Sequence, residues 1–134
     1  KVPVTGSVIV TTPQDIALLD ARKGIRMFEK VGVPILGIVE NMSVHICSNC
    51  GHAEPIFGEG GGAALGTDYQ VPLLGKLPLD LRIRVGLDAG QPIVAADPDS
   101  PISQLYLDIA LKVAGAVAAR ARDTSHKFPK IVIE

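Results

Sequence analysis

Hydrophobic residues along this chain follow two alternating patterns, unbroken runs and helical stripes. Ser7–Thr11 and Pro34–Val39 are unbroken runs rich in β-branched residues, which is typical of strands covered on both faces in a parallel sheet. The stretch between them predicts a helix, because apolar residues recur there at helical spacing: Leu18, Ala21, Ile25 and Phe28. Thr12 is the predicted N-cap, Pro13 the first helical residue and Gly32 the end. This order of strand, helix and strand predicts a βαβ unit.

The second half of the chain resumes this alternation after a polar interruption. Residues 42–59 show no periodicity and predict a loop that contains both cysteines. The elements predicted beyond it are a short helix over 61–68, a third strand over Val71–Leu77, a short helix that follows Asp80 and runs through Leu87, and a long helix capped by Ser100 and Pro101. The sequence therefore predicts an α/β fold around a parallel sheet. Residues 130–133 are compatible with a late edge strand or with a disordered tail.

Composition narrows the classes of function. The 134 residues are 47% hydrophobic and carry a formal net charge of −1, so no charge bias favours nucleic acid or an anionic membrane as a partner. No apolar run approaches the roughly 18 residues that a membrane-spanning helix needs. Two cysteines alone cannot staple a secreted scaffold, so we expect a cytoplasmic protein whose cysteines bind metal or act in redox chemistry.

The two cysteines form a Cys47-x-x-Cys50-Gly51 motif, a spacing that lets two thiolates converge on one metal. Glycine tolerates the backbone conformation that such a tight turn requires. Structural zinc sites and cubane iron–sulfur clusters normally take four ligands, and this chain offers two thiolates. A symmetric dimer would supply the second pair, because a two-fold axis through the site brings both copies of the motif together.

Other interpretations of the same motif remain open at this point. His45 and His52 flank the cysteines and would complete a Cys2His2 zinc site within one chain, although zinc fingers separate the two pairs by about 12 residues or more. A thioredoxin-like redox pair needs a helix N-terminus, whereas the residues around these cysteines favour a turn. Two idle cysteines are the remaining alternative, which the polar surroundings disfavour.

A second candidate site follows the predicted strands. Asn41 comes just after the second strand, where open α/β sheets place ligand contacts, and its amide matches the N6 and N7 edge of adenine. Pro78 and Asp80 follow the third strand in an equivalent position. A turn asparagine is the simpler interpretation of Asn41 on spacing alone. The G-x-x-x-x-G-K-[ST] phosphate loop does not occur in the 134 residues.

In combination, four ordered motifs closely resemble the Mrp/ApbC family of iron–sulfur cluster carriers, which is related to MinD-type P-loop ATPases. The motifs are Thr11-Thr12-Pro13-Gln14-Asp15, Gly37-Ile38-Val39-Glu40-Asn41-Met42-Ser43, Cys47-x-x-Cys50-Gly51 and Leu74-Gly75-Lys76-Leu77-Pro78-Leu79-Asp80. The resemblance covers roughly residues 4–120. It implies a three-layer P-loop NTPase-like fold with a parallel sheet, of which residues 1–122 would be the C-terminal part and 123–134 a tail.

The resemblance also implies specific roles. Members of the family are dimers that hold a [4Fe–4S] cluster between subunits, here through Cys47 and Cys50, and pass it to apo iron–sulfur proteins. Asn41 is similar to the adenine-contacting asparagine of the fold, with Pro78 and Asp80 along the base pocket. A zinc-stapled structural dimer and a MinD-like positioning ATPase are the alternative functions.

One departure from the family pattern is large. The family's phosphate loop and its magnesium- and water-positioning acidic segments lie in an N-terminal half that this sequence does not contain. We therefore expect a C-terminal fragment that keeps the cluster ligands and part of the adenine wall. ATP and Mg²⁺ would act in the intact protein, an expected ATPase, whereas this chain alone would bind ATP weakly and not hydrolyse it.

Overall fold

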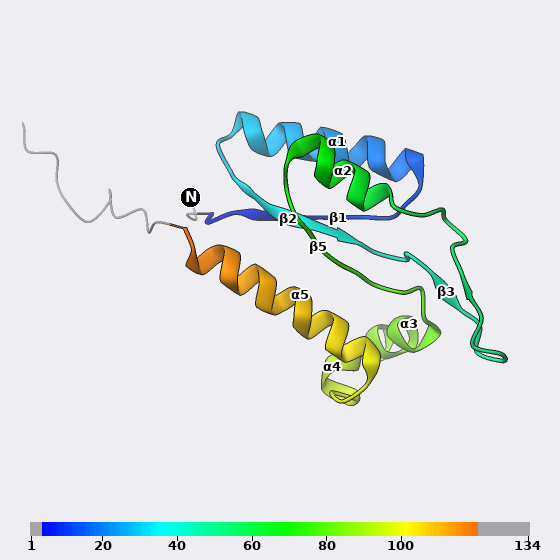
Figure 1. Cartoon of the computed structure of the whole chain (residues 1–134). Coiled ribbons are helices and arrows are strands. Elements are labelled where there is room, and N and C mark those ends of the chain that lie inside the picture. Colours follow the sequence, from blue (N-terminus) through cyan, green and yellow to red (C-terminus); the bar gives the residue numbers. More distant parts are fainter. Residues whose placement is uncertain (1–3, 121–134) are drawn as a thin grey trace, which may run out of the picture.

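The computed structural model describes residues 4–120, and its centre is a parallel sheet of three strands in the order β1-β2-β5 (Figure 1). These strands are β1 (Ser7–Thr11), β2 (Ile35–Glu40) and β5 (Leu73–Lys76). The third strand is shorter than predicted, and the tail over 123–134 lies outside the described residues. Thr11, Glu40 and Lys76 are aligned across the sheet, so the three strands end at one edge.

Helices cover both faces of this sheet. In Figure 1, α1 (Asp15–Lys30) and α2 (Gly61–Tyr69) lie over one face and α5 (Pro101–Ala118) lies against the other. The two faces have separate cores, one built on Ile9, Ile25, Ile38 and Leu65 and the other on Val39, Leu74 and Leu77. The predicted α/β class with a three-layer arrangement is therefore confirmed.

The start of α1 differs from the prediction. Gln14, not Thr12, is the N-cap residue, and Pro13 lies before the helix instead of inside it. The Thr12 hydroxyl donates to Oε1 of Gln14 at 3.0 Å and caps no backbone amide. The physical reason is tertiary, because Pro13 packs against the start of α2: a Cβ at Gly61 would lie 2.9 Å from the Pro13 carbonyl oxygen.

Two other predicted helix ends are confirmed. The Ser100 hydroxyl accepts a hydrogen bond from the amide of Ser103 at 3.2 Å, and Pro101 is the first residue of α5. Gly32, which follows α1, has a φ of +69° and its amide donates to the carbonyl of Glu29, a left-handed ending that favours glycine.

Four short elements complete the structure, and the sequence predicts only one of them. The helix α3 (Leu81–Asp88) follows Asp80 as expected. The helix α4 (Ile93–Ala96) was not predicted, and neither was the antiparallel pair β3 (His45–Ile46) and β4 (Ala53–Glu54). The cysteine-containing loop therefore includes a small β-hairpin. None of the helices in residues 4–120 is long and apolar enough to cross a membrane.

The close packing of α5 on β5 depends on Gly75. A Cβ at this position would lie 2.5 Å from Cγ1 of Ile109. We expect Gly75→Ala to lower the free energy of unfolding in urea by about 1–3 kcal/mol, the usual cost of overpacking. Gly115→Ala on α5 is the matched control, because its added Cβ would meet no other part of the structure within 4 Å beyond its chain neighbours and the backbone of its own helix. Equal stability of the two variants would contradict this packing.

Candidate functional site

The cysteine pair lies at the tip of the β3–β4 hairpin. His45 pairs with Glu54 and Ile46 pairs with Ala53, after which the Cys47 amide donates to the His52 carbonyl at 2.9 Å. The Gly51 amide then donates to the Cys47 carbonyl at 2.8 Å and closes the turn. Gly51 has a φ of +73°, a left-handed conformation that glycine adopts without strain. The turn thus requires the glycine that follows the second cysteine.

Both cysteines are free thiols, of which Cys47 is half-buried and Cys50 is exposed. The pKa of the Cys47 thiol is lowered, chiefly by the backbone N–H of Cys50, then by that of Asn49 and by the Cys50 thiol. Desolvation and the negative charge of Glu54 oppose this shift. The backbone of the turn therefore favours the thiolate, which is the form that binds metals.

One copy of the hairpin provides two thiolates as metal ligands. Within residues 4–120, no three or more His, Cys, Asp or Glu side chains are grouped closely enough to hold a metal ion. The Cys2His2 arrangement with His45 and His52 is therefore not formed in this structure. His45 is half-buried at the base of the hairpin, whereas His52 is exposed in its turn.

The base of the hairpin is joined to the end of β5. The amide and the hydroxyl of Ser43 both donate to the Leu77 carbonyl, at 3.0 and 3.1 Å. The Leu79 amide donates to the Val44 carbonyl at 2.7 Å, and Leu79 forms a parallel bridge with His45. The chain that leaves β2 thus runs beside the chain that leaves β5, and the hairpin continues from this pair.

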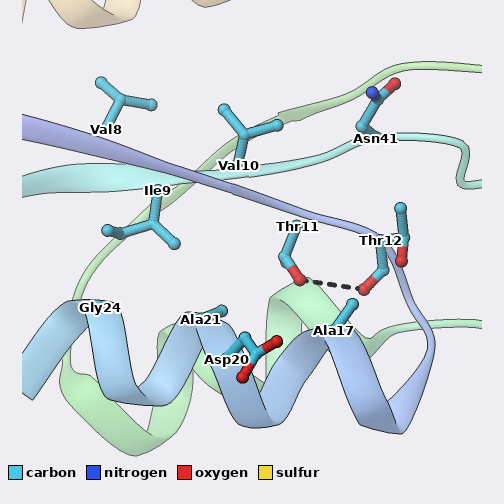
Figure 2. A pocket seen from close by; sticks show the side chains of 10 residues that line it. All are labelled: Val8, Ile9, Val10, Thr11, Thr12, Ala17, Asp20, Ala21, Gly24 and Asn41. Atoms are coloured by element: carbon cyan, nitrogen blue, oxygen red, sulfur yellow. Dashed lines mark hydrogen bonds between the residues drawn. The ribbon is translucent and has the colours of Figure 1, made fainter.

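Asn41 lies at the carboxyl end of the sheet, as predicted. It is one of the residues that line a groove of about 580 Å³ along the outer edge of β1, together with Thr11, Thr12 and the α1 residues Ala17 and Asp20. Figure 2 shows its side chain directed away from α1. Its Oδ1 accepts a hydrogen bond from the Met42 amide at 2.9 Å.

The other two candidate base contacts, Pro78 and Asp80, follow β5. Neither Pro78 nor Asp80 lines the groove beside Asn41. Pro78 is buried, and Asp80 is the N-cap of α3, where its carboxylate accepts from the Arg82 amide at 2.8 Å. The Arg82 guanidinium also binds this carboxylate at 2.8–3.0 Å and lowers the pKa of Asp80. Pro78 and Asp80 both belong to the segment after β5, which runs beside the segment that contains Asn41, because the Leu77 amide donates to the Glu40 carbonyl at 2.8 Å.

One polar residue at this edge was not predicted as functional. Glu40, the last residue of β2, is only 1% exposed and its carboxylate faces the start of α2. The only signal in the sequence is a single acid that ends an otherwise apolar strand.

A parallel sheet covered on both faces by helices is the architecture of open α/β proteins, which bind their ligands at the carboxyl edge of the sheet. The fold is similar to the cell division ATPase MinD of Pyrococcus furiosus, with a TM-score of 0.62 and 27% identity over 83% of this chain and 43% of that one. It is equally similar to the Mg-ADP complex of MinD from Pyrococcus horikoshii, with a TM-score of 0.61, 28% identity and coverage of 87% and 45%.

The family follows from the sequence match. Residues 1–114 match the ParA family model described as "NUBPL iron-transfer P-loop NTPase", and the chain belongs to this family.

Curated relatives agree with this assignment. The chain is 64% identical over 111 residues to an iron-sulfur cluster carrier protein of Pseudomonas fragi and 61% identical over 114 residues to one of Escherichia coli. It is 50% identical over 113 residues to the mouse iron-sulfur cluster transfer protein NUBPL. These alignments cover 83–85% of this chain but 39%, 31% and 35% of the respective relatives.

The lowered pKa of Cys47 can be measured in a Cys50→Ser variant, which keeps a side-chain donor and leaves one thiol. We expect the rate of alkylation by iodoacetamide to rise with pH around a midpoint below that of an unperturbed thiol, because the turn stabilises the thiolate. A Gly51→Ala variant, strained at its positive φ, is expected to move the midpoint upward. A midpoint at or above the ordinary thiol value would contradict the effect of the turn.

Proposed function

We propose that this protein is an iron–sulfur cluster carrier that holds a [4Fe–4S] cluster as cargo and passes it to apo iron–sulfur proteins. The observation that carries this proposal is the free cysteine pair at the exposed tip of the hairpin. Relatives named as iron–sulfur cluster carriers align with the whole region that contains it. An exposed tip suits a cargo that must be handed on, since a recipient's cysteines can reach it.

The ligand count favours a homodimer bridged by the cluster. A cubane cluster takes four thiolates, and Cys47 and Cys50 of two copies would supply them about a two-fold axis. Apolar side chains near the tip support the same arrangement, because Ile46 is 41% exposed and Ile56 is 53% exposed. A second copy that met the first at the hairpin would cover them.

The nucleotide function is a proposal for the whole protein. We assign ATP with Mg²⁺ as the nucleotide and Asn41 as the direct contact to adenine, since Asn41 is one of the residues that line the groove at the carboxyl edge of the sheet. Pro78 and Asp80 would support the base wall from the adjoining segment. The cytoplasm is the proposed compartment, because a reducing environment keeps the two thiols free to bind the cluster.

Anaerobic reconstitution with iron and sulfide tests the carrier function. We expect about two iron atoms per chain, visible charge-transfer absorbance and elution as a dimer, because two Cys pairs complete one cubane cluster. The Cys47→Ala, Cys50→Ala double variant is expected to lose all three properties. His52→Ala, which alters an exposed neighbour in the same turn, is expected to keep them.

Two results would contradict the carrier function. The first is equal iron content in the wild-type chain and the double-cysteine variant. The second is a colourless dimer that keeps zinc bound to the four thiolates and takes up no cluster under anaerobic conditions, which would indicate the zinc-stapled structural dimer.

Nucleotide binding by the isolated chain is expected to be weak. Phosphate contacts supply much of the affinity for ATP, and no phosphate-loop motif occurs within these 134 residues. Isothermal titration at about 0.1 mM ATP should give no saturable heat, and phosphate release should equal the buffer rate. A Kd below about 10 μM, or a turnover lost in Asn41→Ala, would overturn this expectation.

A further inference from the structure

Glu40 is a buried carboxylate at the edge where the strands end. Its side chain is 1% exposed, and its Oε2 accepts a hydrogen bond from the Gly62 amide at 2.6 Å. The Nζ of Lys76 lies 3.4 Å from Oε1, which has no hydrogen-bond partner. Burying a carboxylate is costly unless its contacts compensate, so the position requires an explanation beyond packing.

The contact with Gly62 replaces a missing helix cap. The helix α2 begins after Gly60, a left-handed residue without a side chain, and no side chain at its own N-cap accepts from the first turn. Glu40 accepts instead, from another element, and its charge suits the positive end of the helix. The fit is close, because a Cβ at Gly62 would lie 3.0 Å from the Cβ of Glu40 and 3.1 Å from its Oε2.

This contact lies at one end of the cysteine-containing loop, which in the structure extends over residues 43–60, from the contact with Leu77 to the start of α2. The other end is joined to β5 through Ser43 and Val44. After β4 the backbone hydrogen bonds of residues 55–60 join only residues up to four positions apart, in β4 and the first turn of α2, and none of them reaches the three-stranded sheet. The Glu40–Gly62 hydrogen bond is the first one that returns the chain to the sheet.

The same carboxylate lies next to the candidate nucleotide site. Asn41 is the next residue in the chain, and Lys76, which is aligned with Glu40 across the sheet, precedes the segment that contains Pro78. Glu40, the last residue of β2, therefore contacts both Lys76 at the end of β5 and Gly62 just after the loop.

We propose that Glu40 is a positioning residue that sets the cysteine-containing loop against the carboxyl edge of the sheet and thereby controls how firmly the cluster is held. This role rests on the proposed carrier function. It predicts that loss of the carboxylate loosens the loop and the cluster while the two cores remain intact.

The test compares Glu40→Ala, Glu40→Gln and Gly62→Ala with the wild-type chain. Hydrogen exchange is measured on the apo chain, and cluster loss to a chelator is measured after reconstitution. We expect roughly tenfold faster exchange over residues 43–62 and roughly tenfold faster cluster loss in Glu40→Ala, with unchanged exchange in α1. Glu40→Gln keeps one acceptor for the Gly62 amide and is expected to lie between Glu40→Ala and the wild type.

Gly62→Ala separates positioning from general stability. Alanine favours a helix by up to about 1 kcal/mol over glycine, yet here it would push the carboxylate away, so we expect faster exchange in the loop. Gly115→Ala makes the same change in open space and should leave the loop unaffected.

Unchanged exchange in the loop, equal acceleration throughout the chain, or a loosened loop with an unchanged rate of cluster loss would each overturn the role of Glu40. If the wild-type chain takes up no cluster, the carrier function fails, and hydrogen exchange alone then decides whether Glu40 positions the loop.

Discussion

Parallel pairing of β2 with both of its neighbours determines where every candidate group of this protein lies. The register aligns Thr11, Glu40 and Lys76, so three strands end at one edge and their continuations emerge side by side. Asn41 lies just beyond this edge, among the residues that line the groove beside β1. Two residues later, the Ser43 hydroxyl donates a hydrogen bond to the Leu77 carbonyl. The hairpin that contains the cysteines is therefore an extension of the sheet edge, and its base has a defined position in spite of its exposed tip.

Exposure of the tip is the second constraint. Residues 48–56 are all exposed, and the turn is closed only by hydrogen bonds between backbone groups near Cys47, Gly51 and His52. Such a turn presents two thiols to solvent and can satisfy only half of a four-thiolate site. This exposure supports the proposed carrier function, because the thiols of a second copy or of a recipient can reach the pair.

The buried carboxylate of Glu40 links the edge of the sheet to the end of the loop that contains the exposed tip. Glu40 faces the first turn of α2 from the last position of β2, and the glycines at the start of that helix leave room for the approach. The favourable interaction with the helix end and with Lys76 offsets part of the desolvation cost. A hydrophobic residue at position 40 would pack as well but would leave the Gly62 amide without its partner, so chemistry at this edge, not core volume, accounts for the acid.

The sequence by itself determined those features that depend on neighbours along the chain. Periodicity located β1, α1, β2 and α5, the Ser100–Pro101 pair marked the start of α5, and the spacing of Cys47, Cys50 and Gly51 indicated a turn with two thiols.

Only the tertiary structure decided the rest. Gln14 replaces Thr12 as the cap because Pro13 packs against α2, and the two-residue strands β3 and β4 are too short to show a periodicity. Asp80 is held by Arg82 at the start of α3, and Glu40 contacts an amide 22 residues further along. These interactions join residues that come together only when the sheet forms, and no local pattern in the chain specifies them.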